Sequence, residues 1–158
     1  MLMAAFLNAL NGAPTVPGSF FVGPRAERLI YLAEQRLGVV LPESYREFVR
    51  KLGAGNLGGQ EIFGLIDENF SEAGVPDMVW VTLKARAEWR LPPKYMVINF
   101  DGMGGYLVLN GSPHQGENEP KVASWNPILN ASTMQLEDGE LDFASTFVKW
   151  FNEERGGS

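Results

Sequence analysis

The stretch most suggestive of chemistry is a glycine-rich segment with the spacing of a nucleotide-binding loop. Residues 53–58 read Gly-Ala-Gly-Asn-Leu-Gly, which matches G-x-G-x-x-G. A dinucleotide loop of this kind follows a strand and opens a helix, because the pyrophosphate rests on the helix N-terminus. Here a helical pattern ends at Gly53, and a β-like segment over residues 60–66 comes after the loop. The glycines are therefore interpreted as a helix exit and a turn, and no nucleotide site is expected.

The other residues with catalytic or metal-binding chemistry are isolated from one another. His114 is the only histidine and lies in the polar stretch GSPHQGENEP, with no partner to orient it as a general base. Asp101 precedes a glycine, which is ordinary turn chemistry. Because the chain has no cysteine, a thiolate nucleophile, a thiolate metal site and a disulfide are excluded. The sequence predicts no catalytic residue, no cofactor and no metal site, and so a protein that is not an enzyme.

Acidic residues are unevenly distributed along the chain. The 158 residues carry a net charge of −6, which argues against direct nucleic-acid binding. Residues 61–77 hold five acids and no base, and residues 101–142 hold seven acids and one lysine. If these segments converge in space, they form a negative surface that would attract a basic partner. The alternative is that the acids are dispersed and serve solubility alone.

The elements that must position these residues follow from apolar periodicity and from glycine and proline. Residues 1–23 are expected to form a short helix over 3–10 and a Pro/Gly linker, and residues 24–155 the main domain. No run approaches the ~20 apolar residues of a membrane span, and the N-terminus lacks a signal-peptide charge pattern, so a cytoplasmic protein is expected. Helices are predicted over 24–37, 42–52, 77–89 and 143–154, and strands over 60–66, 95–100, 106–109 and 121–127.

This order of elements predicts a single α+β domain with a central antiparallel sheet flanked by helices. Two helical stripes are expected to face its core, one on each of two helices. Their members are Tyr45, Phe48, Val49 and Leu52 in the first, and Phe143, Phe147, Trp150 and Phe151 in the second.

A series of short motifs also resembles a known family. They are Glu34, Leu37-Gly38, Leu41-Pro42, Tyr45, Phe48, Leu52-Gly53-Ala54-Gly55, Glu61-Ile62-Phe63-Gly64, Leu91-Pro92, Asp101-Gly102, Val122, Trp125, Phe143, Phe147 and Trp150-Phe151. In order and spacing the chain is similar to the SUKH superfamily of Smi/Knr-like domains, and within it to bacterial immunity proteins of the YobK type. The resemblance implies the Smi/Knr-like α+β fold. It also implies a protein that binds and neutralises a cognate secreted toxin, often a nuclease, and no shared catalytic motif.

For such a protein the partner surface is predicted to combine acidic loops with aromatic anchors. Nuclease toxins are typically basic because they hold a phosphate backbone, and tryptophan is enriched at binding hot spots. Two alternatives remain open: a regulatory or scaffold module with a cellular partner, and a small-ligand protein or enzyme with a cleft near Asn99, Asp101 and Tyr106. The predicted partner-binding residues are Asp67, Glu68, Glu72, Trp80, Trp89, Glu117 and Glu119.

Overall fold

The computed structural model describes residues 2–72, 74, 76–112, 119–128 and 137–156. Its helices are α1 (Leu2–Gly12), α2 (Glu27–Leu37), α3 (Glu43–Leu52), α4 (Met78–Trp89) and α5 (Phe143–Gly156), with a 3-10 turn over Ala13–Thr15. Its strands are β1 (Phe20–Phe21), β2 (Gly55–Leu57), β3 (Gln60–Ile62), β4 (Tyr95–Phe100), β5 (Tyr106–Asn110), β6 (Lys121–Trp125) and β7 (Glu137–Asp142). None of these helices combines the length and apolar character needed to cross a membrane.

The strands form one antiparallel sheet in which every strand pairs with its neighbours in sequence, in the order β1 to β7. Ile62 of β3 pairs with Asn99 of β4, and Tyr106 of β5 pairs with Trp125 of β6. The β4–β5 register shifts between Val97 and Asn99. The chain is therefore a single α+β domain with a central antiparallel sheet, as the sequence predicted.

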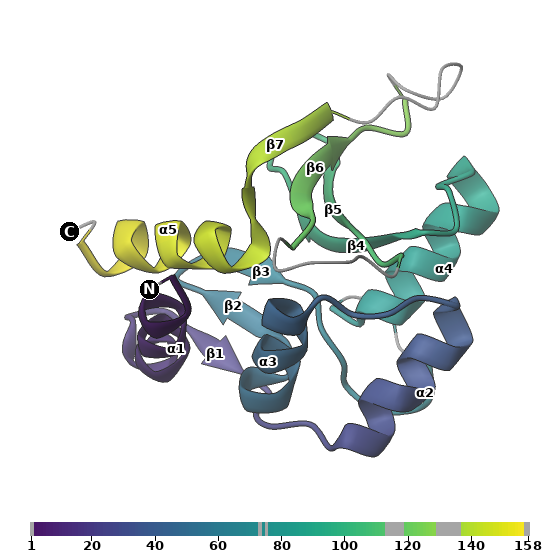
Figure 1. Cartoon of the computed structure of the whole chain (residues 1–158). Helices are drawn as coiled ribbons and strands as arrows, with labels where there is room; N and C mark the ends of the chain where they lie inside the picture. Colours follow the sequence, from purple (N-terminus) through teal and green to yellow (C-terminus); the bar gives the residue numbers. More distant parts are fainter. Residues whose placement is uncertain (1, 73, 75, 113–118, 129–136, 157–158) are drawn as a thin grey trace.

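Helices cover both sides of the sheet, with α4 on one side of β4–β6 and α5 on the other (Figure 1). On the α4 side, the Val97 amide donates a hydrogen bond of 2.9 Å to the Thr82 hydroxyl, which ties the helix to β4. Because both faces are covered, four consecutive residues of β4, from Met96 to Asn99, are buried.

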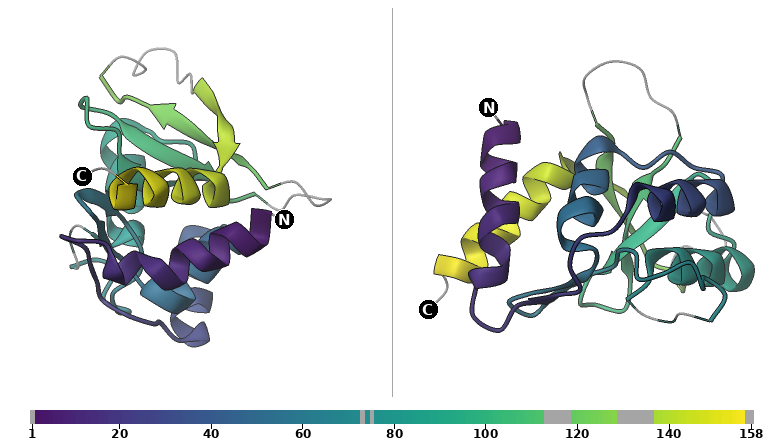
Figure 2. Two further views of the ribbon diagram at one scale, coloured as in Figure 1. Left: turned by 90° about the vertical axis from the view of Figure 1, so that its left-hand side faces the viewer. Right: turned by 90° about the horizontal axis from the view of Figure 1, so that it is seen from below.

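The two predicted helical stripes meet in an aromatic core on the α5 side. Phe143 of α5 packs edge-on against Tyr45 of α3, with ring centroids 5.2 Å apart. Phe6 of α1 lies 5.8 Å from Phe147, and α1 lies against α5 in both views of Figure 2. Edge-to-face pairs of this kind contribute about 0.5–1.5 kcal/mol beyond their buried area.

Gly53 and Gly64 meet where the chain leaves α3 and approaches α4. Gly53 closes α3 with a φ of 77°, as expected of a glycine at a helix exit. A Cβ on Gly64 would lie 1.8 Å from the Gly53 carbonyl oxygen, so only glycine permits this backbone approach. The predicted turn in the G-x-G-x-x-G segment is also confirmed, because residues 58 and 59 join β2 to β3.

β3 ends at Ile62, short of the expected residue 66, and three further strands were not predicted. β1 lies within the expected linker, β2 within the expected glycine loop, and β7 within a stretch expected to be polar and acidic. β1 and β2 have only two and three residues and form through pairing with one another and with β3. β7 carries charged residues that are normally depleted in strands, and it forms by pairing with β6.

Candidate functional site

The acidic loop after β3 is held at both ends by a buried carboxylate. Asp77 caps α4 by accepting a hydrogen bond of 2.9 Å from the Trp80 amide, and its second oxygen lies 3.4 Å from the Ile66 amide. Asp77 is fully buried, and this burial raises its pKa despite the backbone hydrogen bonds. One carboxylate thus fixes both the start of the loop and the first turn of the helix that carries Trp80.

The three predicted acids of this loop, Asp67, Glu68 and Glu72, are exposed and lie close together in the chain. Asp67 accepts a hydrogen bond from the Asn69 amide at 2.9 Å, and Glu72 accepts one from the Asn69 side chain at 3.4 Å. Glu68 lies 3.8 Å from the guanidinium of Arg28 on α2. The loop therefore presents three carboxylates at the surface beside α2.

A hollow of about 280 Å³ is lined by residues of α2, of α4 and of this loop. We call it the α2–α4 hollow; its lining residues are Arg36, Phe70, Ser71, Trp80, Leu83 and Lys84. The structure thus brings Trp80 together with the acidic loop. Arg36 and Lys84 give the lining two cations that the sequence analysis did not single out, because α2 and α4 are distant in sequence.

A half-buried arginine, Arg86, links the two helices that line this hollow. Arg86 of α4 donates a hydrogen bond of 2.9 Å to the carbonyl of Leu37, the last residue of α2. A second nitrogen of Arg86 donates to the Pro93 carbonyl, and burial lowers the pKa of Arg86. The hydrogen bond to Leu37 thus joins α4 to the C-terminal end of α2.

Trp89 does not join Trp80. The two residues lie nine positions apart on α4, which at 3.6 residues per turn places them on opposite sides of the helix. Trp89 packs on the sheet, with its ring 6.0 Å from Tyr106 and 6.4 Å from Trp125. Trp80 and Trp89 are both half-buried, whereas Trp125 and Trp150 are buried, Trp150 as expected from its helical stripe.

The predicted acids at 117 and 119 have different outcomes. Glu117 lies outside the described residues, as does His114. The Glu119 carboxylate accepts hydrogen bonds from the Ser44 amide at 3.0 Å and the Ser44 hydroxyl at 2.7 Å, in the first turn of α3. Because the N-cap residue Pro42 makes no side-chain hydrogen bond of its own, Glu119 supplies that helix with its acceptor.

The alternative cleft near the β4–β5 turn holds polar groups that serve the fold. Asp101 accepts hydrogen bonds from the Met103 and Gly105 amides at 2.7 and 2.9 Å, so its interpretation as a turn residue is confirmed. Asn99 is buried, accepts from Gln60 at 3.0 Å and donates to a backbone carbonyl. Asp101 lines a hollow of about 220 Å³. Neither Asn99 nor Tyr106 is among the residues that line it.

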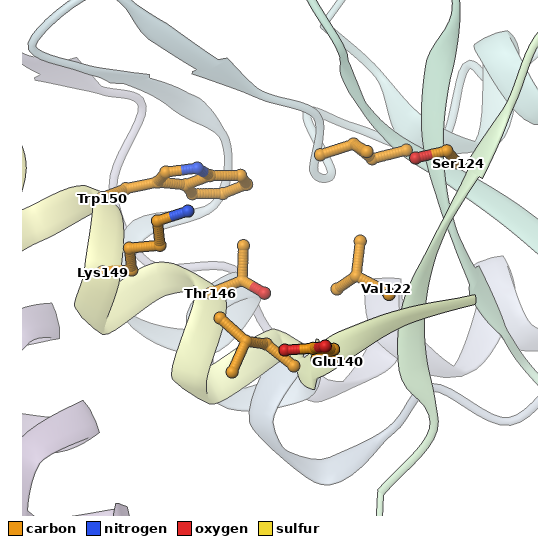
Figure 3. Close-up of a pocket in the computed structure, with 9 residues that line it drawn as sticks. Val122, Ser124, Glu140, Thr146, Lys149 and Trp150 are labelled. Atoms are coloured by element: carbon orange, nitrogen blue, oxygen red, sulfur yellow. The ribbon is translucent and has the colours of Figure 1, made fainter. Parts of the chain in front are cut away.

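A further hollow, of about 230 Å³, lies between α5 and strands β5–β7 (Figure 3). Its lining includes Trp150 and Lys149 from α5, Val122 and Ser124 from β6, and Glu140 from β7. Lys149 lies 3.9 Å from Glu153, and the Thr146 hydroxyl donates to the Asp142 carbonyl at 2.8 Å. This lining combines one acidic and one basic side chain, so it favours neither an anionic nor a cationic ligand. Over the described ranges, no group of three or more acidic or histidine side chains is placed to hold a metal ion.

A comparison with models of protein families gives a match over nearly the whole chain. A model of the SUKH_5 family, described as SMI1-KNR4 cell-wall, matches residues 3–154. The matched range runs from α1 into α5 and includes the acidic loop and the α2–α4 hollow. A search of curated proteins found no match.

Proposed function

The chain belongs to the SUKH (SMI1-KNR4) family, and we propose on this basis that it is a bacterial immunity protein. It binds a cognate toxin, with a nuclease the preferred class, and neutralises it by stoichiometric protein–protein binding in the cytoplasm. No catalytic step and no cofactor is part of this function.

The observation that supports this proposal is the exposed acidic loop lying next to a hollow with a tryptophan in its wall. The carboxylates of Asp67, Glu68 and Glu72 attract a basic partner over a distance and raise its association rate. Trp80, half-buried and accessible through the hollow, then offers a rigid apolar contact of the kind found at hot spots. A complex of this type buries on the order of 1,600 Å² in total.

The role of Glu119 in this interface is reduced by its position. Its carboxylate already accepts two hydrogen bonds from Ser44, and reversing its charge would disturb α3 as well as any partner contact. The acids to alter are therefore Glu68 and Glu72, which are exposed and lie on the loop itself.

A regulatory or scaffold module with a cellular partner is the second candidate. The family description, SMI1-KNR4 cell-wall, favours it, and the described fold accommodates either role. The two candidates differ in the partner: a toxin domain in the first case, and a resident cellular protein in the second.

The test is capture of the partner from the native host, followed by kinetics with the purified partner. The variant Glu68→Lys/Glu72→Lys is compared with the control Glu140→Lys, which reverses the charge of an exposed glutamate on β7. We expect the loop variant to associate at least about tenfold more slowly at low salt and to lose most of the salt dependence. A toxin-like partner with these kinetics supports the immunity function. A resident cellular protein as the stoichiometric partner would support the module instead, and unchanged kinetics would remove the loop from the interface.

A further inference from the structure

The α2–α4 hollow combines an apolar floor with a cationic rim. Phe70 is 5% exposed, Trp80 and Leu83 are half-buried, and the charged ends of Arg36 and Lys84 lie on two different helices. Its volume of about 280 Å³ is slightly below the ~300–1,000 Å³ that is typical of pockets for drug-sized ligands. The space suits one or two side chains rather than a cofactor.

The cations of the rim retain donors for a ligand. The Arg36 guanidinium donates to the neutral Ser71 hydroxyl at 3.2 Å, and within the described part of the chain no carboxylate pairs with it. An arginine has five N–H donors in a planar fork, so most of them stay available for a carboxylate. Lys84 pairs with Glu88 at 3.5 Å in an exposed i,i+4 geometry, a weak pair that a better-placed carboxylate can replace.

The ring of Trp80 completes the arrangement. The Lys84 ammonium lies 5.4 Å from its ring centroid, so the aromatic face and the charge belong to one surface. A ligand that fits must carry a negative group for the rim and an apolar body for the floor. A purely basic or purely apolar ligand satisfies only part of the lining.

We propose that the α2–α4 hollow receives an acidic residue of the partner, with its carboxylate between Arg36 and Lys84 and an adjacent apolar or aromatic side chain on Trp80. The inference rests on the proposed function in one respect, that the occupant belongs to a protein partner. That partner then has two charges of opposite sign in one epitope: basic residues against Asp67, Glu68 and Glu72, and one acid in the hollow. Such an alternation separates the cognate partner from proteins that are merely basic.

The first experiment needs no partner. The protein is labelled with ¹⁵N, the Trp80 indole signal is assigned by its loss in Trp80→Phe, and 3-phenylpropionate is titrated as a probe with one carboxylate and one aromatic ring. The neutral isostere 3-phenylpropionamide is the matched probe. Arg36→Gln/Lys84→Gln is the test variant, and Lys149→Gln, which lines the hollow beside α5, is the matched control. Urea midpoints of the variants establish that they are folded.

We expect 3-phenylpropionate to shift the Trp80 signal, and the amide to bind at least about tenfold more weakly, because it lacks the charge for the rim. The double variant should lose binding by a similar factor, and Lys149→Gln should bind like the parent. Equal binding of the amide, undiminished binding by the folded double variant, or a Trp80 signal that does not respond to the probe would overturn the proposal.

The second experiment separates this inference from the proposed function. With the captured partner, Arg36→Gln/Lys84→Gln should raise the dissociation rate at least about tenfold without slowing association at low salt. That is the opposite pattern to Glu68→Lys/Glu72→Lys. A partner that dissociates from the double variant at the parent rate overturns the subsite while the immunity function stands. If the stoichiometric partner is instead a resident cellular protein, the immunity function fails and the probe titration still decides the subsite.

Discussion

The Glu119 carboxylate caps α3 through Ser44, a residue 75 positions earlier in the chain. Helix caps are usually local, supplied by the residue that precedes the helix. Here Pro42 holds that position and offers no side-chain acceptor, so the cap comes from the segment that leads into β6. The contact joins a helix of the aromatic core to the sheet by a charged hydrogen bond.

Removing this cap should destabilise the protein. Glu119→Ala leaves the Ser44 amide and hydroxyl without their acceptor, and we expect a loss of about 1–2 kcal/mol in the free energy of unfolding. Urea unfolding followed by circular dichroism measures it. Glu140→Ala, which removes an exposed acid of β7, is the control and should change stability by less than about 0.5 kcal/mol. Equal urea midpoints for the two variants would show that the cap contributes nothing.

The buried hydroxyl of Tyr45 should contribute to stability through a single hydrogen bond. It donates to the Phe63 carbonyl at 2.6 Å, and burial, aided by the charge of Asp77, raises its pKa well above 10. Tyr45→Phe keeps the ring in the aromatic core but leaves that carbonyl without this donor, at an expected cost of about 1–3 kcal/mol. Tyr31→Phe, at a tyrosine that is 59% exposed, is the matched control. If both variants unfold at the same urea concentration, the hydrogen bond of Tyr45 does not contribute to stability.

Asp77 should make the protein less stable as the pH rises. Its pKa in the folded protein is raised above the ordinary 3.8, mainly by burial, so the folded state binds the proton more tightly than the unfolded state. The contribution of Asp77 to the free energy of unfolding is then highest below pH 3.8, falls as the pH rises toward the folded pKa, and stays at the lower level above it. Asp77→Asn keeps an acceptor for the Trp80 amide and removes this dependence. Stability of Asp77→Asn relative to the parent should therefore increase between pH 3.5 and 7, and parallel pH profiles for the two proteins would contradict the prediction.

Gly64 should be irreplaceable even by alanine. Its amide donates to the Pro76 carbonyl and its carbonyl accepts from the Met78 amide, while a Cβ would collide with the Gly53 carbonyl oxygen. We expect Gly64→Ala to cost more than about 4 kcal/mol, or to abolish soluble expression, because backbone and not a flexible side chain must move. Gly156→Ala, where nothing lies within 4 Å of the new Cβ, should express and unfold like the parent. Near-parental stability of Gly64→Ala would show that the backbone relaxes there without penalty.

The elements that the sequence predicted well are those whose patterns are local. The stripe of α3, from Tyr45 to Leu52, and the stop at Gly53 lie within one short segment, as do β4, β5 and the turn at Asp101. β1 is a strand because Phe20 and Phe21 pair with Asn56 and Gly55 of β2, and β2 pairs with β3 as well; nothing in the β1 or β2 segment indicates these pairings.

The candidate site shows the same division. The charge of the loop at Asp67, Glu68 and Glu72 is visible in the sequence, and so is the value of a tryptophan as an anchor. Trp80 lies beside this loop, and Trp89 does not. This difference depends on how α4 is rotated against the sheet. The cations of the rim could not be assigned either, because Arg36 reaches the hollow only through the packing of α2 on α4.

The contact between Phe6 and Phe147 also determines when the fold can be completed. Strands that pair only with their sequence neighbours can assemble in order as a chain emerges from the ribosome. Phe6 is made before any of them, yet its partners Phe143 and Phe147 follow all seven. Until α5 has been made, the aromatic side chain of Phe6 lacks the two rings that it packs against in the folded protein. The aromatic core can therefore close fully only after all seven strands have been made, because its phenylalanines lie at opposite ends of the described domain.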